Sequence, residues 1–113
     1  MHEYSIVQSL LDACQEHAKE NSATKVTKVV VKIGVMSGVE PELLKSAFDT
    51  FKEQTICESA EFIMNIQPVK IKCKCCLAES ILAKFEYCCT LCKSQEVDVL
   101  DGEEMYLMQL ELE

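Results

Sequence analysis

The chain has 113 residues, which is enough for one compact domain or for a small domain that carries a metal-stabilised subdomain. Hydrophobic residues make up 49% and charged residues 27% of the sequence, a balance typical of a globular fold and not of a disordered chain. The net charge of −8 disfavours nucleic-acid binding, because that binding depends on Lys and Arg neutralising phosphates. The sequence shows neither an apolar run of the roughly 18 residues that a membrane span needs nor a signal-peptide pattern, so we expect a cytoplasmic protein.

Helix and strand patterns alternate along the first two thirds of the chain. Apolar residues at spacings of three and four predict a helix from residue 4 to about residue 21. A run rich in β-branched residues predicts a strand over 25–33. After a loop, Pro41 suits the first turn of a second helix that runs to about residue 54, and the alternation over 60–67 predicts a second strand.

Six of the eight cysteines lie between residues 73 and 92, within one local segment. Cys73 and Cys76 form one C-x-x-C pair, Cys89 and Cys92 form a second, and twelve residues separate the inner cysteines. Four thiolates in two such pairs are what a closed tetrahedral Zn²⁺ site requires, and a closed site has a structural role. The segment between the pairs has few apolar residues, so we expect the metal to contribute much of its stability.

Other readings of the cysteines stay open. Cys75 and Cys88 stand beside the favoured ligands and could exchange with Cys76 and Cys89. Four thiolates also fit iron, which would make the segment a rubredoxin-like electron-transfer centre. A redox disulfide explains two complete pairs less well than one tetrahedral ion does.

A last strand is predicted over 105–112, after a turn at Asp101 and Gly102. Its start is apolar on both faces, which predicts a central strand covered on both sides. The element order predicts an α+β fold with two helices on a three-stranded sheet and an inserted zinc-ribbon-like subdomain built on four cysteines. We assign residues 1–68 plus 102–113 to an α/β domain and residues 69–101 to a zinc-binding domain.

His2 occupies a position from which it can chelate a metal. The α-amine of Met1, the amide of His2 and the imidazole of His2 can form fused rings around Ni²⁺ or Cu²⁺, which accept nitrogen donors in a square arrangement. A fourth donor could be the amide or carboxylate of Glu3, or a group from elsewhere in the chain. A histidine at position 2 is weak evidence by itself, and the other histidine, His17, is expected to be solvated on the polar edge of its helix.

Taken together, the segments resemble the HypA/HybF family of nickel-insertion accessory proteins for nickel–iron hydrogenase maturation. The resemblance covers essentially the full length and is carried by the M-H-E-Y-S-I-V start, the G-V-E-P-E-L-L segment at 38–44, the paired C-x-x-C motifs and the final strand. It implies a nickel metallochaperone that carries Ni²⁺ as cargo at Met1, His2 and Glu3. The implied zinc ligands are Cys73, Cys76, Cys89 and Cys92.

The resemblance also implies partners. Family members work with a GTPase, HypB, and pass nickel toward the large subunit of the hydrogenase, and some also serve urease through its accessory proteins. Glu40, in the G-V-E-P segment, is a further candidate nickel ligand. The chain departs from the family pattern in two places: no acidic residue follows Gly34, and the cysteine turns lack the usual proline and glycine.

The main alternative is a zinc-ribbon interaction or regulatory module without a nickel function. The sequence contains no recognisable nucleophile with an adjacent base, no phosphate loop and no acid–base carboxylate pair in a known motif. We therefore expect a protein that is not an enzyme, with no nucleic-acid or membrane partner.

Overall fold

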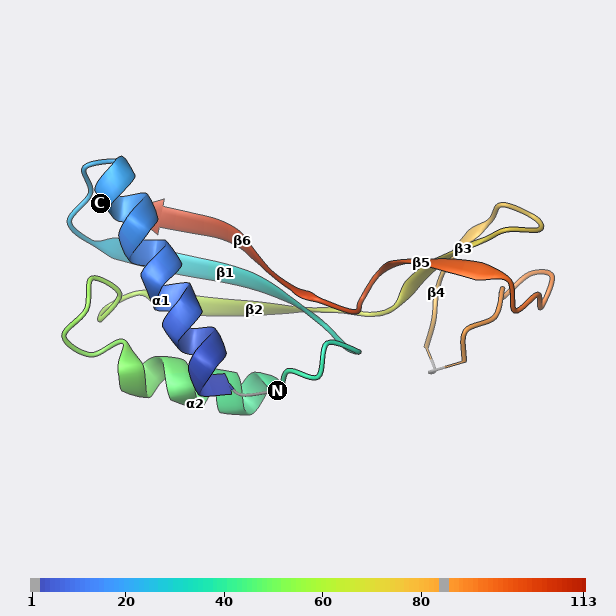
Figure 1. The fold of residues 1–113 in the computed structure, drawn as a ribbon, viewed down its shortest axis with the longest axis horizontal. Helices are drawn as coiled ribbons and strands as arrows, with labels where there is room; N and C mark the ends of the chain where they lie inside the picture. Colours follow the sequence, from blue (N-terminus) through green and yellow to red (C-terminus); the bar gives the residue numbers. More distant parts are fainter. Residues whose placement is uncertain (1–2, 84–85) are drawn as a thin grey trace.

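The computed structural model describes residues 3–83 and 86–113, which form an elongated molecule of 52 × 27 × 17 Å with one sheet toward each end (Figure 1). No helix in these two ranges is long and apolar enough to cross a membrane. The elements in chain order are α1 (Glu3–Glu20), β1 (Val26–Gly34), α2 (Pro41–Phe51), β2 (Glu61–Gln67), β3 (Lys70–Cys73), β4 (Glu79–Ile81), β5 (Val97–Asp101) and β6 (Met105–Leu112).

The larger sheet has the strand order β2-β1-β6, with β1 parallel to β2 and antiparallel to β6. The prediction that the last strand is central was wrong, because β1 takes that place and β6 lies at an edge. β6 is apolar on both faces for another reason. Leu107 and Leu110 pack against the core, whereas Met108 stays exposed where the register against β1 shifts between Val30 and Val31.

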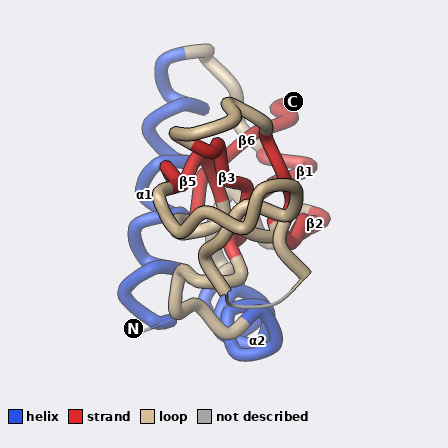
Figure 2. Tube along the Cα trace, turned by 90° about the vertical axis from the view of Figure 1, so that its right-hand side faces the viewer, coloured by secondary structure: helices blue, strands red, loops and turns tan. Residues whose placement is uncertain are grey.

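Both helices cover the same face of this sheet, as the sequence predicted (Figures 1 and 2). The ring of Phe48 on α2 stacks on Phe62 of β2 with the ring centroids 4.3 Å apart. Burial of this face stabilises the fold by about 1.5–3 kcal/mol for each large apolar side chain. The core cluster is built from Val7, Leu10, Leu11, Cys14, Val26, Val29, Val31, Ile33, Val39, Leu44, Ala47, Phe48, Cys57, Ala60 and Phe62.

The apolar residues of α2 outnumber those that the helix buries. Leu44, Ala47 and Phe48 are buried, but Leu43 and Phe51 at its two ends are exposed. The helix also ends at Phe51, before the predicted residue 54, because a series of turns follows it.

The second sheet has the order β4-β3-β5 and is antiparallel throughout. Among residues 69–83 and 86–101, three buried residues form its core cluster, Val69, Ile71 and Leu82, and partly buried Tyr87, Val97 and Val99 pack against them. The segment between the cysteine pairs contains β4, which pairs with β3. These few buried residues contribute little stability by themselves, and the contribution expected from a metal stays a prediction.

Two strand connections join the sheets: residues 67–70, between β2 and β3, and residues 101–105, between β5 and β6. The loop after β1 binds both of them. Val35 N–H donates to the Gln67 carbonyl at 2.9 Å, and Met36 N–H donates to the Gly102 carbonyl at 2.9 Å. Gly34 and Gly102 cross so closely that a Cβ on Gly34 would lie 2.3 Å from the Gly102 carbonyl carbon. We refer to the two strand connections, with the loop after β1 that binds them, as the neck.

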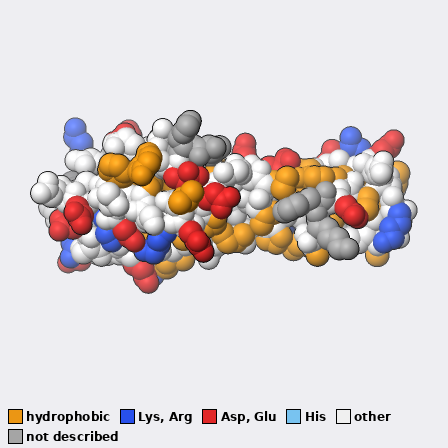
Figure 3. All heavy atoms as spheres, turned by 90° about the horizontal axis from the view of Figure 1, so that it is seen from below, with side chains coloured by type: hydrophobic (Ala, Val, Ile, Leu, Met, Phe, Trp, Pro, Cys, Tyr) orange, Lys and Arg blue, Asp and Glu red, His pale blue; other side chains and the backbone are white. Residues whose placement is uncertain are grey.

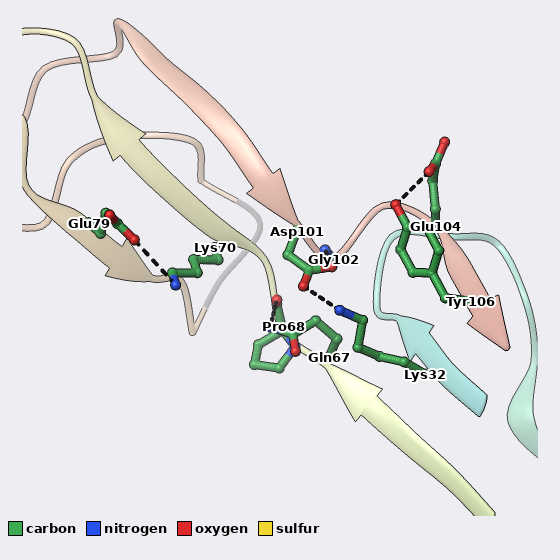
Figure 4. Close-up of polar contacts among 9 residues, drawn as sticks. All are labelled: Lys32, Gln67, Pro68, Lys70, Glu79, Asp101, Gly102, Glu104 and Tyr106. Carbon is green, nitrogen blue, oxygen red and sulfur yellow. Dashed lines mark hydrogen bonds and ion pairs between the residues drawn. The ribbon is translucent and has the colours of Figure 1, made fainter. Parts of the chain in front are cut away.

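An ion pair adds a side-chain contact at the neck (Figure 4). Lys32 Nζ, from the central strand, lies 2.6 Å from Asp101 Oδ2 at the end of β5. The Asp101 carboxylate also accepts the N–H of Gly102 at 2.8 Å. The hydrogen bond from Lys32 is the main reason that the pKa of Asp101 lies below its usual range, and the Gly102 N–H acts in the same direction.

Candidate metal centre

The two C-x-x-C segments fold into turns with the same backbone geometry. Leu77 N–H donates to the Cys73 carbonyl at 3.1 Å, and Lys93 N–H donates to the Cys89 carbonyl at 3.1 Å. Leu77 and Lys93 both have left-handed backbone angles, with φ of 63° and 64°. Glycine adopts these angles without strain, whereas in another residue they cost roughly 1–2 kcal/mol. Both turns have the same shape at this cost, because neither position 77 nor position 93 is a glycine.

These turns bring four sulfur atoms together. The Sγ atoms of Cys73, Cys76, Cys89 and Cys92 all lie within 4.8 Å of one another. Cys73 and Cys92 have their sulfurs 3.5 Å apart, and Cys76 and Cys89 have theirs 3.6 Å apart. Zinc–sulfur bonds of about 2.3 Å in a tetrahedron require sulfurs about 3.8 Å apart, so the donor set fits one tetrahedral ion.

Backbone amides are directed at two of the sulfurs. Cys73 Sγ accepts the N–H groups of Cys75 and Cys76 at 3.3 and 3.4 Å. Cys89 Sγ accepts those of Leu91 and Cys92 at the same distances, 3.3 and 3.4 Å. Hydrogen bonds from Cys92 and Leu91 lower the pKa of Cys89 to about 6, and that from Cys76 lowers the pKa of Cys73. The lowered pKa makes the thiolate, which a metal requires, easier to form at Cys73 and Cys89.

The two extra cysteines lie outside this cluster. The thiol of Cys75 is exposed and lies 3.3 Å from the Ser94 hydroxyl. Cys88 is half-buried at the margin of a surface hollow that Leu82 and Thr90 also line. Neither belongs to the group of sulfurs that could hold an ion, so the geometry favours Cys76 and Cys89 as the donors over their neighbours.

Two of the three N-terminal residues expected to bind nickel, Met1 and His2, lie outside the described residues. Glu3 is the first residue of α1, which begins beside the start of α2 (Figure 1). Its Oε2 accepts the N–H of Glu40 at 3.4 Å. Glu40 is the N-cap residue of α2 and makes no cap with its own side chain, so Glu3 satisfies one of the donors that a helix start leaves free.

This contact was not predicted from the sequence. Glu40 was singled out because it lies in the G-V-E-P segment, and Glu3 because of its place in the N-terminal motif. They are 37 positions apart, and only the packing of α1 beside α2 brings them together. His17, by contrast, lies as expected on the exposed side of α1, with 54% of its side chain accessible and Nδ1 4.0 Å from Glu20.

A family model described as "Hydrogenase/urease nickel incorporation, metallochaperone, hypA" matches residues 1–112. The chain belongs to the HypA family. It is 56% identical to the hydrogenase maturation factor HypA of Shewanella oneidensis and 53% identical to that of Aquifex aeolicus. All of this chain is aligned in both cases, with 96% and 98% of the relatives.

Solved structures agree with this assignment to the HypA family. The solution structure of the nickel metallochaperone HypA from Helicobacter pylori is 40% identical, with a TM-score of 0.71 over 99% of this chain and 97% of that one. A second solution structure of a HypA protein has a TM-score of 0.76 at 40% identity, over 99% of this chain and 96% of that one. The α+β fold and the resemblance seen in the sequence are thereby confirmed. Membership of a nickel metallochaperone family disfavours an electron-transfer protein and a zinc ribbon without a nickel function.

Proposed function

We propose that this chain binds Ni²⁺ at its N-terminus and delivers it for nickel–iron hydrogenase maturation, while the four clustered cysteines hold a structural zinc. The nickel site consists of the Met1 amine with the amide and imidazole of His2, completed by a donor from Glu3 or Glu40. One observation supports this site beyond family membership. The Glu3 carboxylate bonds to the start of α2 and fixes the residue next to His2 beside Glu40.

This arrangement suits a site that must take up and release its cargo. The proposed donors are the first three residues of the chain and the exposed Glu40, and not a closed set of four thiolates, so ligand exchange with a partner is feasible. Glu3 and Glu40 add acidic groups that favour a divalent cation. Affinity should rise with pH, because the His2 amide must lose its proton to bind.

The zinc site has a separate, structural role. Zinc held by Cys73, Cys76, Cys89 and Cys92 would join the two cysteine turns and so stabilise the small sheet formed by β3, β4 and β5. We propose that residues 69–101 form this zinc domain and that residues 1–68 with 102–113 form the nickel domain. In this scheme the GTPase HypB and the hydrogenase large subunit are partners of the chain, and urease accessory proteins are further candidates. The chain itself catalyses no reaction.

A nickel titration by calorimetry tests the proposal on zinc-loaded protein with an untagged N-terminus. The variants are His2→Ala, a version extended by two residues before Met1, and His17→Ala as the matched control. We expect near-stoichiometric binding that the first two changes weaken at least about tenfold, a loss of about 1.4 kcal/mol, and that the control leaves intact. Zinc content should stay the same in all four proteins.

Two outcomes would contradict the proposal. Unchanged binding by His2→Ala would remove the N-terminal site and direct attention to the cysteines. Absence of nickel binding in every version would leave a zinc-binding protein without a nickel function.

A further inference from the structure

Apolar side chains gather on the surface beside the start of α1. Tyr4, Leu43 and Phe51 are 67%, 57% and 45% exposed. Tyr4 and Phe51 pack edge to face with their ring centroids 5.3 Å apart. Between α1 and α2 lies a hollow of about 160 Å³, which we call the α1–α2 hollow, lined by Glu3, Tyr4, Leu43, Ser46, Ala47 and Thr50. Figure 3, which looks onto the α2 side, shows exposed apolar side chains interspersed with acidic ones in this half of the molecule.

The fold itself does not explain why these side chains are apolar. Leu43 and Phe51 lie outside the core cluster, so replacing them by polar residues would sacrifice little burial. Exposed apolar and aromatic groups around a concavity are typical of binding sites for other proteins, in which a few such residues carry most of the energy. At about 30 Å³ per water, the hollow has the volume of roughly five waters and can admit one large apolar side chain.

The charges around the hollow indicate the chemistry of the partner. Glu3 lines it, and Glu40 and Glu42 lie at the adjoining start of α2. Within residues 3–83 and 86–113, none of these three carboxylates takes part in an ion pair. The lysines of this region, Lys45 and Lys52, pair with Asp49, which does not line the hollow.

The distribution of charge along the chain points the same way. Residues 69–101 contain five lysines and five acidic residues, so the net charge of −8 belongs to the remainder of the chain. A partner that docks on this acidic part of the chain gains electrostatic complementarity if Lys or Arg residues surround its apolar contact. A second copy of this chain would bring the same negative charge and is disfavoured.

We propose that the α1–α2 hollow is the docking site of a partner protein that inserts one large apolar side chain flanked by Lys or Arg. The inference rests on the proposed function, since Glu3 both lines the hollow and follows His2 in the chain. A partner seated there is held next to the nickel chelate. Ligand exchange then takes place within a complex, where the effective concentration of the accepting ligands is high.

The test uses Leu43→Glu with Met108→Glu as the matched control. Both side chains are exposed to the same degree, 57% and 56%, but Met108 lies on β6 and is not among the residues that line the hollow. The probe is purified HypB from the same organism, titrated against zinc-loaded protein by biolayer interferometry. We expect Leu43→Glu to weaken binding at least about tenfold and Met108→Glu to leave it unchanged.

Several results would overturn the inference: equal binding by Leu43→Glu and wild type, an equal loss in Met108→Glu, or no binding by the wild type. Sedimentation showing a wild-type dimer that Leu43→Glu abolishes would assign the hollow to a second copy instead. A parallel nickel titration separates this inference from the proposed function. Retained nickel binding in Leu43→Glu with lost partner binding supports the docking site, whereas nickel binding absent from the wild type contradicts the proposed function alone.

Discussion

Replacing Cys76 by serine is expected to weaken zinc binding at least about a hundredfold. This exceeds the roughly 10–100-fold loss of metal affinity that follows when a residue hydrogen-bonded to a metal ligand is replaced. The thiolate is lost from a cluster in which Cys76 Sγ lies 3.6 Å from Cys89 Sγ. Because the core cluster of the second sheet holds three buried residues among those that the structure describes, loss of the metal should unfold that sheet and leave the larger one intact. Metal analysis and amide hydrogen exchange over residues 69–101 measure the two effects.

The neighbouring residue provides the control. Cys75→Ser removes an exposed thiol that contacts Ser94 and lies outside the group of four sulfurs, so zinc content and exchange protection should match the wild type. An equal loss in Cys75→Ser would show that the two adjacent cysteines exchange as ligands. Full zinc content in Cys76→Ser would show that Cys76 is not a ligand.

Gly102→Ala is expected to destabilise the protein by about 3 kcal/mol or more. Gly102 has φ of 103°, and a Cβ there would lie 2.6 Å from the Val69 Cα. The strained backbone angle costs roughly 1–3 kcal/mol, and forcing atoms into a packed site costs a similar amount. Since the neighbouring atoms are backbone, relief of the clash requires the two strand connections of the neck to separate. Urea denaturation measures the loss.

Gly38→Ala separates these two costs. Gly38 also has a left-handed backbone angle, with φ of 80°, but no atom lies within 4 Å of the position of its Cβ. Its substitution should therefore cost only the conformational part, about 1 kcal/mol. Equal effects of the two substitutions would mean that the close crossing at the neck does not contribute to stability.

The parts of the fold that could be predicted from sequence are those set by local patterns. The β-branched run of β1 fits the pleated surface of a sheet, and Val26, Val29 and Val31 of that run are buried while Val30 is half-buried. Apolar spacing predicted both helices, and the C-x-x-C spacing predicted the four sulfurs that the structure brings together. Each of these features depends on residues close together in the chain.

The features that the sequence did not reveal depend on contacts between distant segments. β6 was predicted to be central because its start is apolar on both faces. The shift of register against β1 at Met108 accounts for this pattern, and it is visible only in the pairing of the two strands. The exposure of Leu43 and Phe51 follows from the way α2 lies against its neighbours and not from its own pattern. The contact between Glu3 and Glu40 likewise requires the starts of the two helices to meet.

X-ray absorption at the nickel and zinc edges of one sample loaded with both metals tests most directly whether nickel binds at a site separate from the zinc site. The account predicts nitrogen and oxygen neighbours with no sulfur at nickel, and four sulfurs at about 2.3 Å at zinc. Sulfur neighbours at nickel would place the cargo at the cysteines and contradict the N-terminal site. Fewer than four sulfurs at zinc would contradict the assignment of Cys73, Cys76, Cys89 and Cys92 as its ligands.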